Sequence, residues 1–291
     1  MHKFLRAIGF SRVTGCKTEE LLLKDVLSGY DSKRTVEDRD KNLFVEISKE
    51  YGLNFGVTVC GTYDEDNLFR MGYYFPYLKG QMVTTYDQAS IERRIANQAY
   101  SAACDDSRIG ATVIFYLQNA ADYIQNSQSD KIGNRDLPIS LAALAEYGSI
   151  LLPVAKEVKA PVESAADIQS RNQLYEAAQN GDQDAIEDLT LKDMDTYNRL
   201  SKRVQKEDIY TIVDTFFMPH GLECDYYSLM GDIAECTAVR NSLTGELLYQ
   251  MQVICNGISI DVMINAADLL GEPKVGRRFK GVVWLQGRID F

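Results

Sequence analysis

The Asn256-Gly257 pair is the strongest constraint that this sequence places on its fold. It separates an apolar run at residues 247–255 from a run at 258–264 in which branched aliphatic residues stand at every second position. A two-residue hairpin turn needs a positive φ at both central residues, which Asn and Gly adopt at low cost. The pair therefore predicts a tight antiparallel hairpin.

Further strands are expected on both sides of this hairpin, at residues 209–217, 232–240 and 279–291. Gly281 and Gly287 would bend the last of these strands. Five strands in about 80 residues are typical of a small β-barrel of the OB type. We therefore expect an OB-like barrel over residues 208–291, although an SH3-like barrel or a fragment of a sandwich has the same strand count.

Residues 1–155 combine two periodicities and predict an α+β domain. Apolar and polar residues alternate from 43 to 86 with turn residues between the runs, so three or four antiparallel strands are expected there. Thr18 and the acids after it predict the start of a helix, and Gly29 its end. Residues 4–10, 112–117 and 149–154 are expected to be strands, and residues 87–104 a helix.

Acidic residues gather between these two parts of the chain. Residues 156–225 contain 8 basic and 15 acidic side chains. Capping residues and helical spacing predict a helical connector over residues 156–207. The surplus of acid is typical of a solvated helix face, and an acidic docking surface is the alternative.

The whole chain of 291 residues carries 31 basic and 42 acidic side chains, a formal net charge of −11. This balance argues against general coating of nucleic acid, which depends on neutralising phosphates. The most apolar stretch, residues 137–155, contains Pro138, Glu146 and Pro153, so no membrane contact is expected. The N-terminus has no apolar leader, and the six cysteines form no C-x-x-C pair. We therefore expect a cytoplasmic protein with reduced thiols.

The common catalytic and cofactor motifs are missing from the sequence. It contains no G-x-G dinucleotide fingerprint, no Gly-Lys-Ser/Thr phosphate loop, and no H-E-x-x-H, G-x-S-x-G or S-x-x-K motif. Only two histidines are present, His2 and His220, which makes a zinc site hard to build. The sequence therefore favours a non-enzymatic protein with no cofactor and no metal.

One group of residues could nevertheless carry chemistry. His220, Glu223 and Asp225 stand within six positions of each other after a predicted strand, beside a thiol and two phenols. Imidazole and carboxylates serve in metal binding and in general acid–base catalysis. The three are candidate catalytic residues of a hydrolase or a metal-assisted enzyme. The alternative is a corner between strands whose polar groups satisfy backbone amides.

A basic strip follows near the C-terminus. Residues 274–288 contain five basic side chains and no acid. Strand alternation predicts that several of these groups share one face with the only tryptophan of the chain. The candidate ligand-binding residues are Arg277, Arg278, Lys280, Trp284 and Arg288. The favoured interpretation is docking onto the acidic segment of this chain or of a second subunit; an anionic ligand and stacking of single-stranded nucleic acid on Trp284 are the alternatives.

A cluster of aromatic residues surrounds Pro76. Tyr73, Tyr74, Phe75 and Tyr77 stand together in one of the predicted strands. Alternation would bury some of them and expose others. Packing at a sheet edge is one interpretation, and an exposed tyrosine strip that contacts a ligand or a protein is the other.

Several segments together resemble a known family. They are residues 1–10, residues 207–210 and 221–225, and residues 271–273, 276–281 and 284–287. In these segments the chain is similar to an uncharacterised full-length family of clostridial-type Firmicutes proteins, the domain of unknown function 3881. The resemblance implies a bacterial cytoplasmic protein. It implies no activity and no catalytic residues.

These observations lead to three hypotheses about function. The first is a non-enzymatic cytoplasmic binding or assembly protein that contacts a small anionic ligand, an unknown protein partner or a second copy of itself. The second is an enzyme centred on His220, Glu223 and Asp225. The third is single-stranded nucleic-acid binding on the C-terminal barrel, which requires Trp284 to be exposed.

Overall fold

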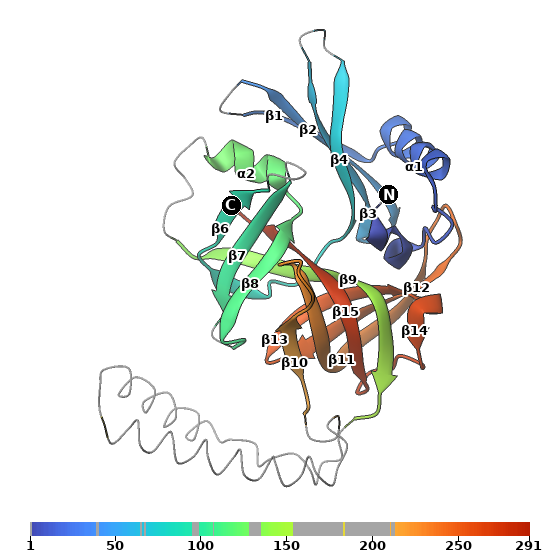
Figure 1. Ribbon diagram of the computed structural model, residues 1–291, viewed down its shortest axis with the longest axis vertical. Helices are drawn as coiled ribbons and strands as arrows, with labels where there is room; N and C mark the ends of the chain where they lie inside the picture. Colours follow the sequence, from blue (N-terminus) through green and yellow to red (C-terminus); the bar gives the residue numbers. More distant parts are fainter. Residues whose placement is uncertain are drawn as a thin grey trace. The chain divides into compact units, whose positions relative to one another are not determined.

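The computed structural model describes residues 2–38, 41–64, 66, 68–94, 99–106, 108–127, 135–153, 183, 210 and 213–291. The chain divides into two compact units. One combines Met1–Leu152 with Thr215–Phe291, and the other is Pro153–Asp214. The second unit lies almost wholly outside the described residues, and so does the helical connector predicted over residues 156–207. The first unit is described below (Figure 1).

A four-stranded antiparallel sheet, which we call the small sheet, is formed by β1 (Ser32–Glu37), β2 (Leu43–Gly52), β3 (Phe55–Tyr63) and β4 (Phe69–Leu78) in sequence order. The antiparallel strands predicted between residues 43 and 86 are therefore confirmed. Helix α1 (Cys16–Ser28) lies along one side of the sheet (Figure 1). It buries Leu22, Leu23 and Val26 in the same core cluster as the apolar residues of β2 and β3.

An eleven-stranded sheet, the large sheet, contains the remaining described strands of this unit. Its order is β10-β11-β12-β13-β9-β15-β8-β7-β6, and β5 and β14 also pair with β9. The strands are β5 (Thr85–Asp87), β6 (Ser90–Arg93), β7 (Tyr100–Asp106), β8 (Ala111–Leu117), β9 (Leu137–Leu151), β10 (Phe216–Pro219), β11 (Tyr226–Arg240), β12 (Leu247–Cys255), β13 (Ile258–Asn265), β14 (Leu269–Leu270) and β15 (Arg278–Ile289).

Five strands of the large sheet close on themselves, because β11 pairs with β15 as well as with β12. The ring runs β11-β12-β13-β9-β15, and β9 lies parallel to β13 and antiparallel to β15. The hairpin between β12 and β13 is the predicted one: Asn256 has φ 49° and Gly257 φ 79°.

The expected fold class, an α+β N-terminal domain beside a self-contained OB-like barrel over residues 208–291, is wrong. The described chain is mostly β with two sheets. The ring of five strands is completed by β9, which comes from the N-terminal part of the sequence. The reason lies in the apolar run of β9, which buries residues on both faces and is typical of a central strand rather than a strand at a sheet edge.

Two local predictions are also wrong, and one helix was not predicted. Residues 4–10 contain a 3-10 helix, η1 (Lys3–Ile8), which ends at Gly9 with φ 89°. The helix predicted over residues 87–104 is replaced by β6 and β7. In β7 every second residue from Ala102 to Asp106 is buried, and this is a strand period. Helix α2 (Ala120–Ser127) is short and polar, so its apolar spacing gave little signal. A second 3-10 helix, η2, spans Ala266–Asp268.

Two buried glutamines join the two sheets. The amide oxygen of Gln286, from β15, accepts hydrogen bonds from the main-chain N–H of Leu78 (3.2 Å) and from Gln118 Nε2 (2.9 Å). Gln286 Nε2 donates to the Pro76 carbonyl (2.8 Å), and Gln118 Nε2 also donates to the Leu78 carbonyl (2.8 Å). The amides thus form hydrogen bonds with the backbone of β4 at the edge of the small sheet, where no other described strand pairs with β4.

We predict that Gln286→Leu destabilises the protein by about 3 kcal/mol, because it leaves the Leu78 N–H and the Pro76 carbonyl buried without partners. The free energy of unfolding from urea denaturation measures this. Gln88→Leu is the control, because Gln88 is exposed. It should change stability by less than about 0.5 kcal/mol. Equal stability of the two variants would show that the glutamine junction is dispensable.

Candidate functional site

The predicted catalytic residues lie at the corner between β10 and β11, but their side chains form no hydrogen bonds with one another. His220 Nδ1 lies 3.1 Å from the Ser228 hydroxyl oxygen, and the Glu223 side chain is exposed. Among the described residues, no hydrogen bond joins His220 to either carboxylate, and no cluster of His, Cys, Asp and Glu could hold a metal ion. The corner thus separates these three side chains.

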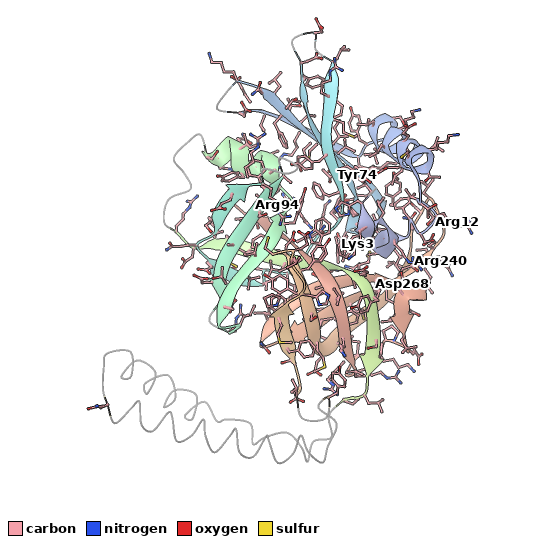
Figure 2. All side chains as sticks on the ribbon, viewed as in Figure 1. Lys3, Arg12, Tyr74, Arg94, Arg240 and Asp268 are labelled. Carbon is pink, nitrogen blue, oxygen red and sulfur yellow. The ribbon has the colours of Figure 1, made fainter. Side chains whose placement is uncertain are left out.

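Asp225 is buried, with 1% of its surface exposed. Its Oδ2 accepts hydrogen bonds from Arg94 Nη2 and from the indole N–H of Trp284, both at 2.7 Å. Arg94 also donates to the Ser101 hydroxyl, and its guanidinium carbon lies 5.9 Å from the centre of the Tyr116 ring. Figure 2 labels Arg94, whose side chain is 24% exposed. This arrangement is a buried ion pair that fixes β11 against the strands beside it.

Trp284 belongs to the core and has 3% of its surface exposed. Its ring stacks on Phe4 with centroids 5.3 Å apart, and it meets His2 at 4.7 Å and Tyr116 at 5.0 Å. The predicted alternation along β15 does place Trp284, Gln286 and Arg288 on one face. That face is covered by the small sheet and η1, so Trp284 is not available to stack on a base.

The basic side chains of the C-terminal strip have separate neighbours. Arg277 donates to the Glu272 carbonyl at 2.7 Å. Arg278 is buried, and its Nε donates to the Leu152 carbonyl at 3.0 Å. Lys280 is partly buried. Arg288 lies 3.3 Å from Asp122, at the start of α2. The acidic segment proposed as a docking partner lies outside the described residues, so that interpretation stays a prediction.

A small polar pocket between the two sheets brings together side chains that the sequence keeps far apart. It measures about 90 Å³. We call it the inter-sheet pocket, and it is lined by Ser32, Arg34, Glu46, Ser48, Thr58, Phe75, Tyr77, Lys79, Gln118 and Arg288. Strand register explains why the polar residues meet, because Arg34 pairs with Glu46 and Ser48 pairs with both Ser32 and Thr58. These positions share the face of the small sheet opposite α1.

Glu46 is the carboxyl group of the inter-sheet pocket. Its Oε2 accepts a hydrogen bond from the main-chain N–H of Ala121 at 3.2 Å, in the first turn of α2. Burial raises the pKa of Glu46 to about 7; Asp122 raises it further, while the Ala121 N–H, Arg34 and Arg288 act in the opposite direction. Both protonation states are therefore populated near neutral pH, which is common at functional sites.

Tyr77 supplies a phenol that is 3% exposed. Its hydroxyl is buried and has no hydrogen-bond partner among the described residues. A buried polar group without a partner costs about 1–3 kcal/mol, so its presence usually marks a bound water, ion or ligand. Three other buried polar atoms of the described residues also lack a partner: Asp87 Oδ2, Asp225 Oδ1 and Gln250 Nε2. Tyr77 is the one of these four residues that lines the inter-sheet pocket.

Three cationic side chains surround the inter-sheet pocket. Arg34 and Arg288 both contact the Asp122 carboxylate, and Lys79 Nζ lies 2.6 Å from Glu50. Each side chain is nearly half exposed, which leaves it able to turn toward a ligand. A pocket of this size accommodates a few waters or one small oxyanion.

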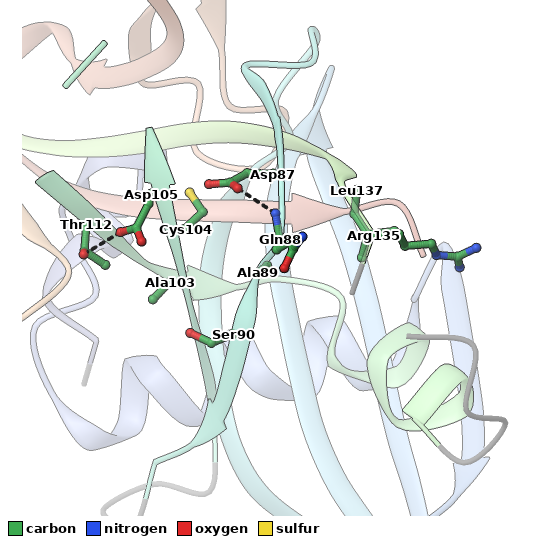
Figure 3. Close-up of a pocket in the computed structure, with 10 residues that line it drawn as sticks. All are labelled: Asp87, Gln88, Ala89, Ser90, Ala103, Cys104, Asp105, Thr112, Arg135 and Leu137. Carbon is green, nitrogen blue, oxygen red and sulfur yellow. Dashed lines mark hydrogen bonds between the residues drawn. The ribbon is translucent and has the colours of Figure 1, made fainter. Parts of the chain in front are cut away.

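A second pocket, of about 600 Å³, lies between β5, β6 and β7 and lacks the cationic cluster of the inter-sheet pocket (Figure 3). Asp105 accepts from the Thr112 hydroxyl at 2.6 Å, and Asp87 Oδ1 accepts from the Gln88 N–H at 2.7 Å, whereas Asp87 Oδ2 is buried without a partner among the described residues. Burial raises the pKa of the Cys104 thiol to about 12, with Asp87 adding to the effect, so the thiol stays protonated at neutral pH. Arg135 points away from the other lining residues in Figure 3.

The sequence missed Glu46, Arg34 and Lys79 as site residues. The available signal was the row of polar residues at alternate positions of β2, which a sequence reading takes as a solvated face. Arg288 was among the predicted ligand-binding residues, and Tyr77 was in the aromatic cluster. Both line the inter-sheet pocket.

The fold and the pocket thus define a predominantly β protein with a polar site between two sheets. A family model described as a domain of unknown function, E. rectale gene description (DUF3881), matches residues 5–287. The chain belongs to this family, as the resemblance predicted. No curated protein and no solved structure matches it. Within the described part of the chain, we find no helix with the length and apolarity required to cross a membrane.

We predict that Arg94→Met destabilises the protein by about 3 kcal/mol, because it leaves the Asp225 carboxylate buried without its cation. Arg240→Met is the matched control. Arg240 lies at the periphery in Figure 2 and donates to the Gly245 carbonyl at 2.9 Å. Its loss should matter little. Thermal and urea unfolding measure the stability of the two variants. Equal loss of stability in both would contradict the prediction.

We also predict a stability change with pH for Glu46→Gln. In the folded protein the pKa of Glu46 is about 7, against an ordinary value of 4.5. The folded state therefore binds this proton more tightly, so wild-type stability falls as pH rises from about 4.5 to about 7. Glutamine does not ionise, so the variant does not lose this stability as the pH rises. Relative to the wild type, the variant should gain roughly 3 kcal/mol between pH 4.5 and pH 8, at about 1.4 kcal/mol per pKa unit.

Urea denaturation at several pH values measures this gain. Glu50→Gln is the control, since Glu50 lies on the same strand but is exposed. A Glu46→Gln curve parallel to the wild-type curve at all pH values would show that Glu46 ionises as it does in the unfolded chain.

Proposed function

We propose that this protein is a non-enzymatic cytoplasmic binding protein that holds a small anionic ligand in the inter-sheet pocket. The observation that carries the proposal is the buried Tyr77 hydroxyl without a partner. It shares the pocket with three cationic side chains and with a carboxyl group that is protonated about half of the time at neutral pH.

The chemistry of the pocket favours an oxyanion. The Tyr77 hydroxyl, the two guanidinium groups and the Lys79 ammonium can all donate hydrogen bonds. Sulfate, phosphate and carboxylate groups offer several acceptor oxygens at once, and charge-assisted hydrogen bonds to them are strong. A volume of about 90 Å³ admits a single group of this kind. A larger ligand would leave its remaining part in solvent.

Other parts of the molecule support binding more than catalysis. The only predicted catalytic carboxylate that is buried, Asp225, already holds Arg94 and Trp284. Cys60, Cys104 and Cys255 are buried among apolar side chains, as small core residues of a protein from a reducing compartment would be. This packing supports a cytoplasmic location.

Sulfate titration followed by calorimetry and by backbone amide NMR at pH 6 tests the proposal. We expect chemical-shift changes at Tyr77, Gln118, Ala121 and Arg288. Tyr77→Phe should weaken sulfate binding about tenfold or more, because a hydrogen bond to a charged group contributes about 1.5–3 kcal/mol. The same variant should be no less stable than the wild type, since it removes an unpaired hydroxyl.

Tyr63→Phe is the matched control. Tyr63 lies on β3, and its hydroxyl accepts from Lys33 at the surface (2.7 Å) rather than facing the inter-sheet pocket. It should bind sulfate as the wild type does. Unchanged affinity in Tyr77→Phe, or shifts confined to residues outside the pocket, would refute the proposed site.

A further inference from the structure

We infer that the inter-sheet pocket takes up one proton together with its oxyanion and that Glu46 receives this proton. The inference rests on the proposed function and specifies how the same site is regulated. Its consequence is that the ligand is held in acid and released in base. The ligand class is an oxyanion that brings no proton of its own.

The hydrogen bonds of Glu46 leave a place for the proton. Oε2 accepts from the Ala121 N–H at 3.2 Å, and no hydrogen bond from a described residue reaches Oε1. In the protonated carboxyl group Oε2 can remain the acceptor as the carbonyl oxygen, while Oε1–H becomes a donor. Protonation thus converts the carboxyl group from a repulsive neighbour of an oxyanion into one more donor, with no change in the contact to α2.

The charges around Glu46 also favour an anion when Glu46 is protonated. Asp122 faces it from α2, Arg34 from β1 and Arg288 from β15. Four other titratable groups lie nearby: Cys60 on β3, Tyr73, Tyr77 and Tyr116. Their pKa values are raised, so they stay neutral near pH 7. Lys79 is paired with Glu50, so this pair adds no net charge. With Glu46 ionised, the remaining two carboxylates, Glu46 and Asp122, balance the two guanidinium groups. With Glu46 protonated, one positive charge is in excess, and an added anion neutralises it.

The proton balance is simple. One proton from the buffer binds to the Glu46 carboxylate as the oxyanion enters, and no other bond forms or breaks. If only the protonated pocket binds, the apparent affinity falls with the protonated fraction. With a pKa of about 7, that fraction changes from about nine-tenths at pH 6 to about one-tenth at pH 8.

Calorimetric titration with inorganic sulfate, whose charge is constant over this range, tests the inference in two buffers of different ionisation enthalpy. For the wild type we expect binding about tenfold weaker at pH 8 than at pH 6. We also expect uptake of nearly one proton per sulfate at pH 8 and almost none at pH 6. The uptake is read from the dependence of the heat on the buffer.

Glu46→Gln should bind sulfate equally at both pH values and without proton uptake, because the glutamine amide keeps a donor and an acceptor at the same place. Glu20→Gln is the control, because Glu20 is an exposed carboxylate on α1 and does not line the pocket; it should retain the dependence of the wild type on pH. Should Glu46→Gln fail to fold, the carboxyl carbon of Glu46 can be titrated by NMR in the wild type. Sulfate at ten times its dissociation constant should raise the midpoint by about one pH unit.

The possible failures are distinguishable. Sulfate binding that is equal at pH 6 and pH 8, with no proton uptake, would overturn the inference and leave the proposed function standing. Absence of sulfate binding in every variant at both pH values would overturn both. A dependence on pH that persists in Glu46→Gln would assign the proton to another group and also overturn the inference.

Discussion

A junction of amide hydrogen bonds joins the two sheets beside the apolar core cluster that they share. Gln286 and Gln118 donate to and accept from the backbone of β4 at Pro76 and Leu78. An edge strand normally exposes these backbone groups to solvent, and burying them without partners would be costly. The glutamines satisfy them, and they fix β4 at the position that encloses the inter-sheet pocket. Gln118 itself lines that pocket.

Buried polar groups cluster at two places in this unit, one around Asp225 and the other around Glu46 and Tyr77. At Asp225, one carboxylate oxygen, Oδ2, accepts from both Arg94 and Trp284, and this contact holds strands together, while Oδ1 has no partner among the described residues. At Glu46 and Tyr77, part of the hydrogen-bonding capacity has no partner among the described residues. Glu46 and Tyr77 also line the inter-sheet pocket beside three cationic side chains, so a ligand bound there can offset the cost of the unpaired hydroxyl. We therefore assign the binding role to the second.

The sequence predicts local elements well where one residue type determines the backbone. Asn256 and Gly257 determined their hairpin, and alternation identified β2 to β4 and much of β15. The long-range placement of β9 was not predictable in this way, because a strand that is apolar on both faces does not reveal its partners. The binding site was not predictable for the same reason. In the sequence Glu46 stands in the polar positions of an alternating strand, and the contact with α2, which is distant along the chain, is seen only in the fold.

The central claim is that the space between the two sheets is an oxyanion site. Anomalous diffraction at the selenium edge, from crystals of the protein grown at pH 6 with selenate, tests it most directly. The account predicts a selenium peak in the inter-sheet pocket, with an oxygen within hydrogen-bond distance of the Tyr77 hydroxyl. Selenium peaks only at surface lysines and arginines, with water alone beside Tyr77, would contradict it.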